Sequence, residues 1–369
     1  MREGFIFGSG VHGRIFLKAL VNHQFNVLGF IDDKAIEGEL VEGLPTFRPS
    51  QVANKSLPVL VSVGLISKSI KSRLLGEGFH DVLDFTECMN QLPALVGPMA
   101  KTSMWYSSEP SEMVDIDRLA QVRSMFSDDI SKRLLDKIID FRLNPRTEAY
   151  ITPDSHTQYF PSDIDVFNGL ETVRFIDGGA FTGDTVATLC RVCASKAKKL
   201  DYVACFEPDP SNIFSLSQTI KREHFSANNF DAYLYRAGLW SEASLRSFNP
   251  SANASSSIAK PVSQESQDLV QCFTLDETVL YAAPNFVKLD IEGAEKEAIT
   301  GAREIISTLK PVMAIALYHK PSDLWEIPLL VAKINPDYCM HLRVYGDMFL
   351  ETVLYCLPKS YANINRDFI

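Results

Sequence analysis

The chain has 369 residues, of which 46% are hydrophobic and 22% charged, and its formal net charge is −10. This is the composition of a globular protein with room for two or three domains, and it excludes disordered, collagen-like and coiled-coil chains. The negative charge, without a basic patch, argues against nucleic acid as a partner. The longest apolar runs, 59–65 and 312–318, are strand-sized, so we expect no membrane span.

The N-terminus and the cysteines both indicate a cytoplasmic protein. The chain carries Glu3 and enters a strand pattern at once, unlike a signal peptide. The seven cysteines are an odd set within apolar runs, which favours reduced core thiols over disulfides. Cys190 and Cys193 form a single C-x-x-C with no second pair or nearby histidine, so we predict a buried helix face there instead of a zinc site.

Residues 1–98 have the pattern of a small, parallel, Rossmann-like α/β domain. Apolar strand-sized runs alternate with helical periods, and glycines punctuate the turns between them. The predicted elements are strands at 5–7, 27–31, 57–63 and 82–85 and helices at 15–21 and 66–75.

The first turn of this domain has the G-x-G-x-x-G spacing of a dinucleotide-binding fingerprint, and acids follow at the end of the next strand. Main-chain N–H groups of such a turn can bind a diphosphate, and the acids can accept hydrogen bonds from a ribose or base. NAD or a nucleotide sugar is therefore the predicted ligand. A docking or dimerisation module that has lost its ligand would keep the same pattern. The predicted second nucleotide site consists of Gly8, Gly10, His12, Gly13, Asp32 and Asp33.

Residues 99–154 are predicted to be a helical connector. Apolar residues recur every three to four positions between Ile116 and Phe141, with a break near Ser127 that indicates a helical hairpin. A second βαβ series, which includes a strand at 232–239 and a helix from Glu292, then predicts another doubly wound domain over 155–369. Within it, residues 250–268 are rich in Ser, Ala and Asn and are predicted to form a surface loop or lid.

Acids and glycines mark the strand ends of the second domain. Glycines between a buried strand and a helix let the backbone approach a ligand, and the helix N-terminus offers N–H donors. Glu207 ends the next strand, where a carboxylate can accept both ribose hydroxyls. The predicted cofactor-binding residues are Asp177, Gly178, Gly179, Phe181, Thr182, Gly183, Glu207 and Asp290.

Asp290, Glu292 and His319 are the candidate catalytic residues. Each follows a predicted parallel strand, and because such strands end at one edge of a sheet, we expect the three to converge. Any of them could take the proton of a hydroxyl. Alternatively, Asp290 and Glu292 could hold a magnesium ion that lowers the hydroxyl's pKa. The sequence leaves both alternatives open.

Several motifs, in this order, resemble those of the FkbM family of S-adenosylmethionine-dependent methyltransferases. The resemblance covers residues 155–357 and implies a class I methyltransferase fold, with the methionine end of the cofactor at 177–183 and its ribose on Glu207. Tyr159 becomes a candidate substrate contact. Gly178 departs from the commoner Ile or Val, which we do not expect to affect binding. The motifs are Gln158-Tyr159-Phe160, Asp-Gly-Gly-Ala-Phe-Thr-Gly at 177–183, Phe206-Glu207-Pro208, Thr274-Leu275-Asp276-Glu277, Lys-Leu-Asp-Ile-Glu-Gly-Ala-Glu at 288–295 and Tyr318-His319.

The N-terminal turn, with Gly29-Phe30-Ile31-Asp32-Asp33, resembles the nucleotide-sugar-binding domain of some sugar acyltransferases. Together the resemblances imply an O-methyltransferase for a small-molecule or glycan hydroxyl. One alternative is a non-catalytic nucleotide-binding scaffold. Another, an NAD-dependent sugar-modifying oxidoreductase, is weak, because the only Tyr-x-x-x-Lys runs from Tyr355 to Lys359 and contains Pro358. Association into a homo-oligomer is left open.

Overall fold

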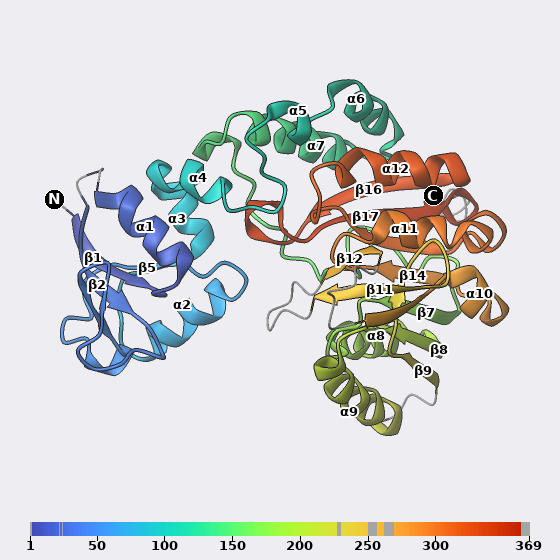
Figure 1. The fold of residues 1–369 in the computed structure, drawn as a ribbon, viewed down its shortest axis with the longest axis horizontal. Coiled ribbons are helices and arrows are strands. Elements are labelled where there is room, and N and C mark those ends of the chain that lie inside the picture. The colour runs from blue at the N-terminus through green and yellow to red at the C-terminus, as the bar shows by residue number, and fades with distance from the viewer. Residues whose placement is uncertain are drawn as a thin grey trace. The chain divides into compact units, whose positions relative to one another are not determined.

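The computed structural model describes residues 2–21, 23, 25–226, 230–249, 257–261 and 269–362 (Figure 1). The chain divides into two compact units, and the predicted connector is distributed over both. Unit 1 comprises Met1–Val114, Arg133–Asp154 and Val344–Leu350, and unit 2 comprises Asp115–Lys132, Ser155–Arg343 and Glu351–Ile369.

Unit 1 is built on a six-stranded sheet in the order β3-β4-β2-β1-β5-β6. All neighbours pair in parallel except β3 with β4, a hairpin that the sequence pattern did not reveal. Helix α1 (Val11–Val21) connects β1 to β2, and α2 (Ser67–Gly76) connects β5 to β6. The strands are β1 (Arg2–Phe7), β2 (Phe25–Ile31), β3 (Leu40–Val41), β4 (Leu44–Phe47), β5 (Val59–Val61) and β6 (Val82–Leu83).

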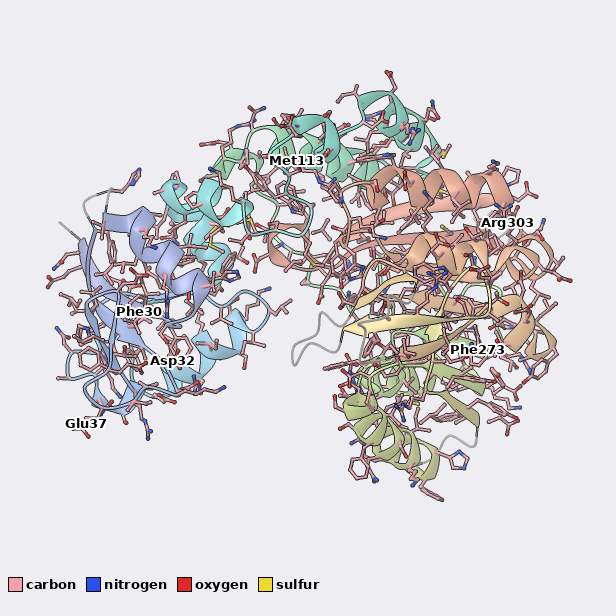
Figure 2. The ribbon with its side chains drawn as sticks, in the orientation of Figure 1. Phe30, Asp32, Glu37, Met113, Phe273 and Arg303 are labelled. Atoms are coloured by element: carbon pink, nitrogen blue, oxygen red, sulfur yellow. The ribbon has the colours of Figure 1, made fainter. Side chains whose placement is uncertain are left out.

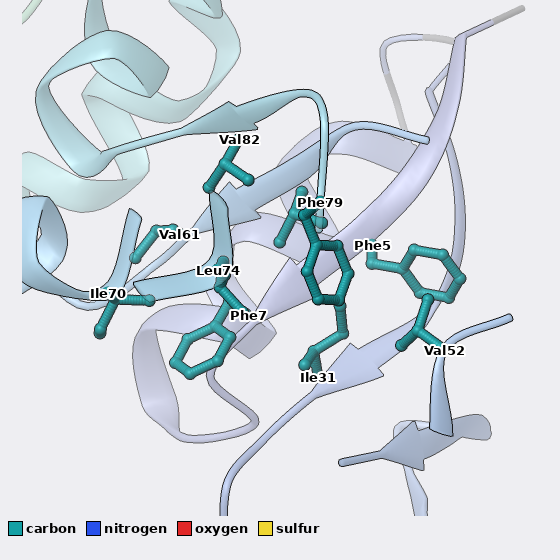
Figure 3. Close-up of a cluster of buried hydrophobic side chains, with 10 residues drawn as sticks. Phe5, Phe7, Ile31, Val52, Val61, Ile70, Leu74, Phe79 and Val82 are labelled. Atoms are coloured by element: carbon teal, nitrogen blue, oxygen red, sulfur yellow. The ribbon is translucent and has the colours of Figure 1, made fainter. Parts of the chain in front are cut away.

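Alternate residues of β1 explain one layer of the unit 1 core. Phe5 and Phe7 are two positions apart and therefore point to the same face of the sheet. They share a buried cluster with Val61 of β5 and with Ile70 and Leu74 of α2 (Figure 3). Burial of these apolar side chains holds α2 against the sheet.

Two helices between residues 116 and 143 follow the predicted apolar period, whereas the shorter helices between 85 and 113 were not predicted. The break in the hairpin falls at residues 126–128, between α6 and α7. Asp84 accepts a hydrogen bond from the main-chain N of Glu87 and receives one in return, so a capping box begins α3. The helices are α3 (Phe85–Gln91), α4 (Pro93–Ala100), α5 (Pro110–Met113), α6 (Ile116–Met125) and α7 (Asp129–Leu143), with short turns η1 (Pro49–Gln51) and η2 (Thr147–Ala149).

Unit 2 contains a seven-stranded sheet in the order β16-β17-β15-β14-β7-β8-β9. Strands β9, β8, β7, β14 and β15 are parallel, and β17 is antiparallel to β15. The chain winds outward from β7 in both directions, which makes the β7–β14 junction the topological switch point. The strands are β7 (Thr172–Gly178), β8 (Lys199–Phe206), β9 (Asp231–Tyr235), β14 (Phe286–Leu289), β15 (Val312–Ala316), β16 (Tyr338–Val344) and β17 (Thr352–Pro358).

Crossover helices complete this doubly wound unit, as the pattern predicts. The helix expected from Glu292 begins at Glu295 instead. The helices are α8 (Asp184–Ser195), α9 (Pro210–Ser226), α10 (Leu275–Val279), α11 (Glu295–Thr300), α12 (Asp323–Ile334) and α13 (Lys359–Ala362), with short 3-10 turns η3 (Leu280–Ala282) and η5 (Asp347–Phe349) and a π-helical segment η4 (Ile305–Leu309).

A second, four-stranded sheet of unit 2 has the order β10-β13-β11-β12. The strand predicted over 232–239 divides between β9 and β10. The predicted lid is wrong for residues 257–261, which form β12 and pair with β11; the rest of 250–268 lies outside the described residues. The strands are β10 (Gly238–Leu239), β11 (Ser244–Asn249), β12 (Ser257–Pro261) and β13 (Leu269–Phe273).

All seven cysteines are free, and Cys190 and Cys193 are buried on α8 as predicted. None of the helices in the described part of the chain combines the length and apolar character that crossing a bilayer requires.

Candidate functional site

A glycine loop joins β7 to α8 at the switch point. Gly179 has a φ of 76°, and a Cβ atom on it would lie 1.8 Å from the carbonyl oxygen of Asp290. Only glycine therefore lets this loop lie directly against the end of β14. Gly183, with a φ of 87°, makes the left-handed turn that starts α8.

Asp177 supports this loop from beneath. Its side chain, predicted to bind the cofactor, is fully buried, and its Oδ1 lies 3.0 Å from Nζ of the equally buried Lys288. Lys288 Nζ also donates hydrogen bonds to the carbonyl oxygens of Gly178 and Gly179, at 3.1 and 2.7 Å. Burial raises the pKa of Asp177 to about 6. The pair fixes the loop to β14, so Asp177 can influence a ligand only through the loop.

Glu207 joins the glycine loop to the turn after β8. Its Oε2 accepts a hydrogen bond from the main-chain N of Phe181 at 2.8 Å, and its Oε1 accepts one from the main-chain N of Asp209 at 2.9 Å. Burial raises the pKa of Glu207. The side-chain amide of Asn212 also approaches Oε1, at 3.4 Å, whereas Oε2 keeps a second lone pair that can accept a hydrogen bond from a ligand hydroxyl.

Asp290 follows β14 and is held by two tyrosines. It accepts hydrogen bonds from the hydroxyls of Tyr159 at 2.5 Å and Tyr318 at 3.0 Å. Burial acts to raise the pKa of Asp290, but the charges of His319 and Lys288 outweigh it and lower the pKa. Tyr159, predicted as a substrate contact, is buried, and its own main-chain N donates to the hydroxyl of Tyr355.

His319, just beyond β15, brings the predicted acids together. Its Nε2 lies 3.4 Å from Oδ1 of Asp290 and 3.5 Å from Oε2 of Glu292, while its Nδ1 lies 2.9 Å from Oε1 of Glu295. Burial acts to lower the pKa of His319, but the surrounding carboxylates raise it to about 9. Burial raises the pKa of Glu292 to about 7 against the attraction of His319.

Four residues at this sheet edge were not among the predicted site residues. Glu295 is fully buried, and its Oε1 accepts the main-chain N–H of Ile291 at 2.8 Å. An acid in the first turn of a helix is ordinarily explained by its favourable interaction with the helix dipole, so its position did not mark Glu295 as a site residue. Lys288 offered a clearer signal, since lysine is rare within a buried strand. The four are Lys288, Glu295, Tyr318 and Glu351, and burial raises the pKa of Glu351 to about 7.

The predicted N-terminal site is also partly assembled. Gly8 has a φ of 98°, and a Cβ atom on Gly13 would lie 1.9 Å from the carbonyl oxygen of Gly8, so α1 starts tightly against β1. Asp32 follows β2 (Figure 2), and its Oδ2 accepts hydrogen bonds from the main-chain N and the hydroxyl of Ser9 at 3.0 and 2.7 Å. Asp32 is therefore hydrogen-bonded directly to the glycine turn.

Two other predicted residues of that site have different surroundings. Asp33 forms a two-pronged ion pair with Arg73 of α2, with both N···O distances 2.8 Å. His12 is exposed in the first turn of α1, with its ring 6.5 Å from that of Phe85. Asp33 is thus bound by a residue of its own unit, whereas His12 remains accessible.

A doubly wound sheet with a glycine loop at its switch point and acids at the neighbouring strand ends defines a ligand-binding α/β domain. The family model described as the methyltransferase FkbM domain matches residues 177–348. This part of the chain is therefore a methyltransferase domain of the FkbM family.

One solved structure supports the fold. The crystal structure of the methyltransferase FkbM from Methylobacillus flagellatus KT has a TM-score of 0.64 and 23% identity, covering 96% of this chain and 89% of that one. A LepI variant in complex with SAH and a substrate analogue has a TM-score of only 0.28 and 10% identity, covering 79% of this chain and 77% of that one. No curated protein matches the chain.

Proposed function

We propose that this methyltransferase transfers the methyl group of S-adenosylmethionine to a hydroxyl of a sugar, a glycan or a related natural product. The observation that carries the proposal is the convergence of Asp290, Glu292 and His319 beside Gly179 at the switch point. Proton-accepting groups there would lie next to a ligand held by the glycine loop.

The cofactor is assigned to the glycine loop and Glu207. Main-chain N–H groups of the loop suit a carboxylate or other anionic group, and Glu207 suits the two ribose hydroxyls. Asp177 and Lys288 would hold the loop in its binding conformation, given their buried ion pair. Such preorganisation lowers the cost of ordering the loop when the cofactor binds.

Methyl transfer needs a proton acceptor for the attacking hydroxyl. The oxygen forms a bond to the methyl carbon as the carbon–sulfur bond breaks, and the hydroxyl proton passes to a base. Asp290 accepts hydrogen bonds from two tyrosine hydroxyls, and its lowered pKa makes it a weak base. Glu292 has a side chain that is 23% exposed, and within the described chain only His319 pairs with its carboxylate. Glu292 is therefore the proposed base, and His319 positions it.

Glu292→Gln tests this assignment. We expect methyl transfer to fall by about 10²- to 10⁴-fold, because the base is lost, while S-adenosylmethionine affinity measured by calorimetry stays unchanged. Transfer is followed with labelled cofactor and a panel of sugars and nucleotide sugars. The exposed Glu304→Gln is the matched control. Full activity in Glu292→Gln would remove Glu292 as the base, and absence of cofactor binding by the wild type would refute the proposed function.

The cofactor assignment has its own test in Glu207→Ala. A hydrogen bond to a charged group contributes about 1.5–3 kcal/mol, so the affinity for S-adenosylmethionine should fall about 10- to 100-fold. Glu171→Ala, at an exposed position before β7, should bind normally. Equal affinity in Glu207→Ala and the wild type would remove Glu207 from the site.

We also propose that unit 1 binds a nucleotide-linked group, with a nucleotide sugar preferred over NAD. The supporting observation is the contact of Asp32 with Ser9, which joins an acid to the glycine turn. Gly10→Ala adds a methyl group that meets nothing within 4 Å, so it should block a diphosphate without disturbing the fold. Gly76→Ala, equally unobstructed, is the control. Tight NAD binding by the full chain without UDP-sugar binding would overturn this assignment.

A further inference from the structure

We infer that Asp290, Glu295 and His319 form a binding site for a divalent first-row metal ion such as Mn²⁺. One oxygen of each carboxylate and one ring nitrogen of His319 lie within 4.8 Å of one another. Three such donors around a common point can act as ligands of one cation after small side-chain adjustments.

Unsatisfied buried donors support this inference independently of the acidic cluster. Glu295 is fully buried, and its Oε2 has no hydrogen-bond partner among the described residues. Nδ1 of His319 faces Glu295, but its Nε2 has no hydrogen-bond partner there, with carboxylate oxygens no nearer than 3.4 Å, although the side chain is only 1% exposed. Because buried polar atoms in proteins are almost always paired, these atoms point to a missing ligand.

Charge points to a cation in particular. Asp290, Glu292 and Glu295 surround His319, so even a protonated imidazole leaves the cluster negative. The neighbouring lysines are committed elsewhere: Lys288 pairs with Asp177, and Lys320 donates to the carbonyl oxygen of Gly293. Buried carboxylates are costly unless they are paired or coordinate a metal.

The donor types select the kind of metal. Carboxylates suit Mg²⁺, Ca²⁺ and Mn²⁺, whereas imidazole suits Zn²⁺ and other transition metals. A set of two carboxylates and one imidazole therefore favours Mn²⁺ or Zn²⁺ over Mg²⁺. This changes the predicted magnesium site at Asp290 and Glu292, since Glu295 and His319 replace Glu292 in the donor set. Glu292 stays outside it and can serve as the proposed base.

The ion's role, unlike its binding, rests on the proposed function. A cation on Asp290 would lie beside the acceptor hydroxyl and favour loss of its proton to Glu292. The binding test therefore uses Mn²⁺ alone, without cofactor or acceptor, so that the two hypotheses can fail separately.

Mn²⁺ titration of the full, chelator-treated chain by electron paramagnetic resonance tests the site. We expect one equivalent bound by the wild type and by Glu304→Gln, and at least a tenfold loss of affinity in Glu295→Gln and Asp290→Asn. Should these variants not fold, spin-echo modulation of the wild-type complex still decides, because a bound imidazole gives a nitrogen coupling.

No Mn²⁺ binding by the wild type, bound Mn²⁺ without nitrogen coupling, or unchanged affinity in folded Glu295→Gln would each overturn the site. S-adenosylmethionine binding is measured by calorimetry in parallel. If the cofactor binds to a chain that does not bind Mn²⁺, the metal site fails and the proposed function stands. If Mn²⁺ binds and the cofactor does not, the metal site stands and the proposed function fails.

Discussion

At the scale of single residues, buried charge has the largest consequences in unit 2. Asp177 and Lys288 are 0% and 3% exposed at their side chains and lie 3.0 Å apart. Lys288 also satisfies two carbonyl oxygens of the glycine loop. Losing either member would leave the other charge buried without a partner. The pair therefore holds the loop in position more strongly than its Coulomb attraction alone would.

Lys288→Met should lower the free energy of unfolding by about 3 to 5 kcal/mol, because it leaves Asp177 buried without a partner. Adding Asp177→Asn should recover part of that loss, since the uncompensated carboxylate is then absent. Denaturant unfolding of both variants and of Asp177→Asn alone closes a double-mutant cycle. Strictly additive effects would show that the two side chains do not interact.

At the scale of elements, the junction of β7 with β14 depends on a single glycine. Gly179→Ala would place a Cβ atom 1.8 Å from a carbonyl oxygen at a φ of 76°. We expect a loss of about 3 kcal/mol or more in stability and a loss of cofactor binding. Gly76→Ala, which meets nothing within 4 Å at the end of α2, should change stability by less than about 1 kcal/mol. Comparable melting temperatures for the two variants would contradict this account.

The start of α7 is tied to β16 by a charged network. Oδ2 of Asp128 lies 2.7 Å from Nδ1 of His341 and 3.0 Å from Nη2 of the buried Arg343. Burial acts to raise the pKa of Asp128, but the hydrogen bonds that it accepts outweigh burial and hold the pKa well below its usual range. A carboxylate with a lowered pKa stabilises the fold above its ordinary pKa and loses this contribution as the pH falls toward the lowered value.

Asp128→Asn should therefore cost about 2 kcal/mol near neutral pH. The difference from the wild type should stay constant down to about pH 4 and shrink below it, because the carboxylate is then protonated in the unfolded chain while it is still charged in the folded one. Asp129→Asn, at a side chain that is 80% exposed, should show neither effect. Urea unfolding as a function of pH measures both, and a difference that grows on acidification would contradict the assigned sign.

At the scale of the whole molecule, the two proposed ligand sites lie in two units with separate sheets. A ligand at 100 times its dissociation constant adds about 2.7 kcal/mol to the stability of the folded part that binds it. S-adenosylmethionine should thus raise the melting transition of unit 2, and a UDP-sugar that of unit 1. Calorimetric scans with each ligand, repeated with Glu207→Ala and Gly10→Ala, assign the shifts. A shift by S-adenosylmethionine that survives in Glu207→Ala but vanishes in Gly10→Ala would reverse the assignment.

The sequence alone determined the order of elements and the strand ends that carry the candidate site. Apolar period, glycine turns and acids after strands are local signals, so they located β7, β8, β14 and β15 and placed Glu207, Asp290 and His319 at their ends. The β3–β4 hairpin and β12 escaped prediction, because short edge strands form only when a neighbouring strand supplies their hydrogen bonds.

Only the tertiary structure decided which side chains meet. Tyr159 and Asp290 are 131 positions apart, yet they share a hydrogen bond. Likewise, no local pattern shows that Asp177 turns inward to Lys288, or that Glu295 rather than Glu292 faces Nδ1 of His319. The physical reason is that the direction of a side chain at a strand end is set by packing against neighbours distant in sequence, whereas the strand itself is specified by its own residues.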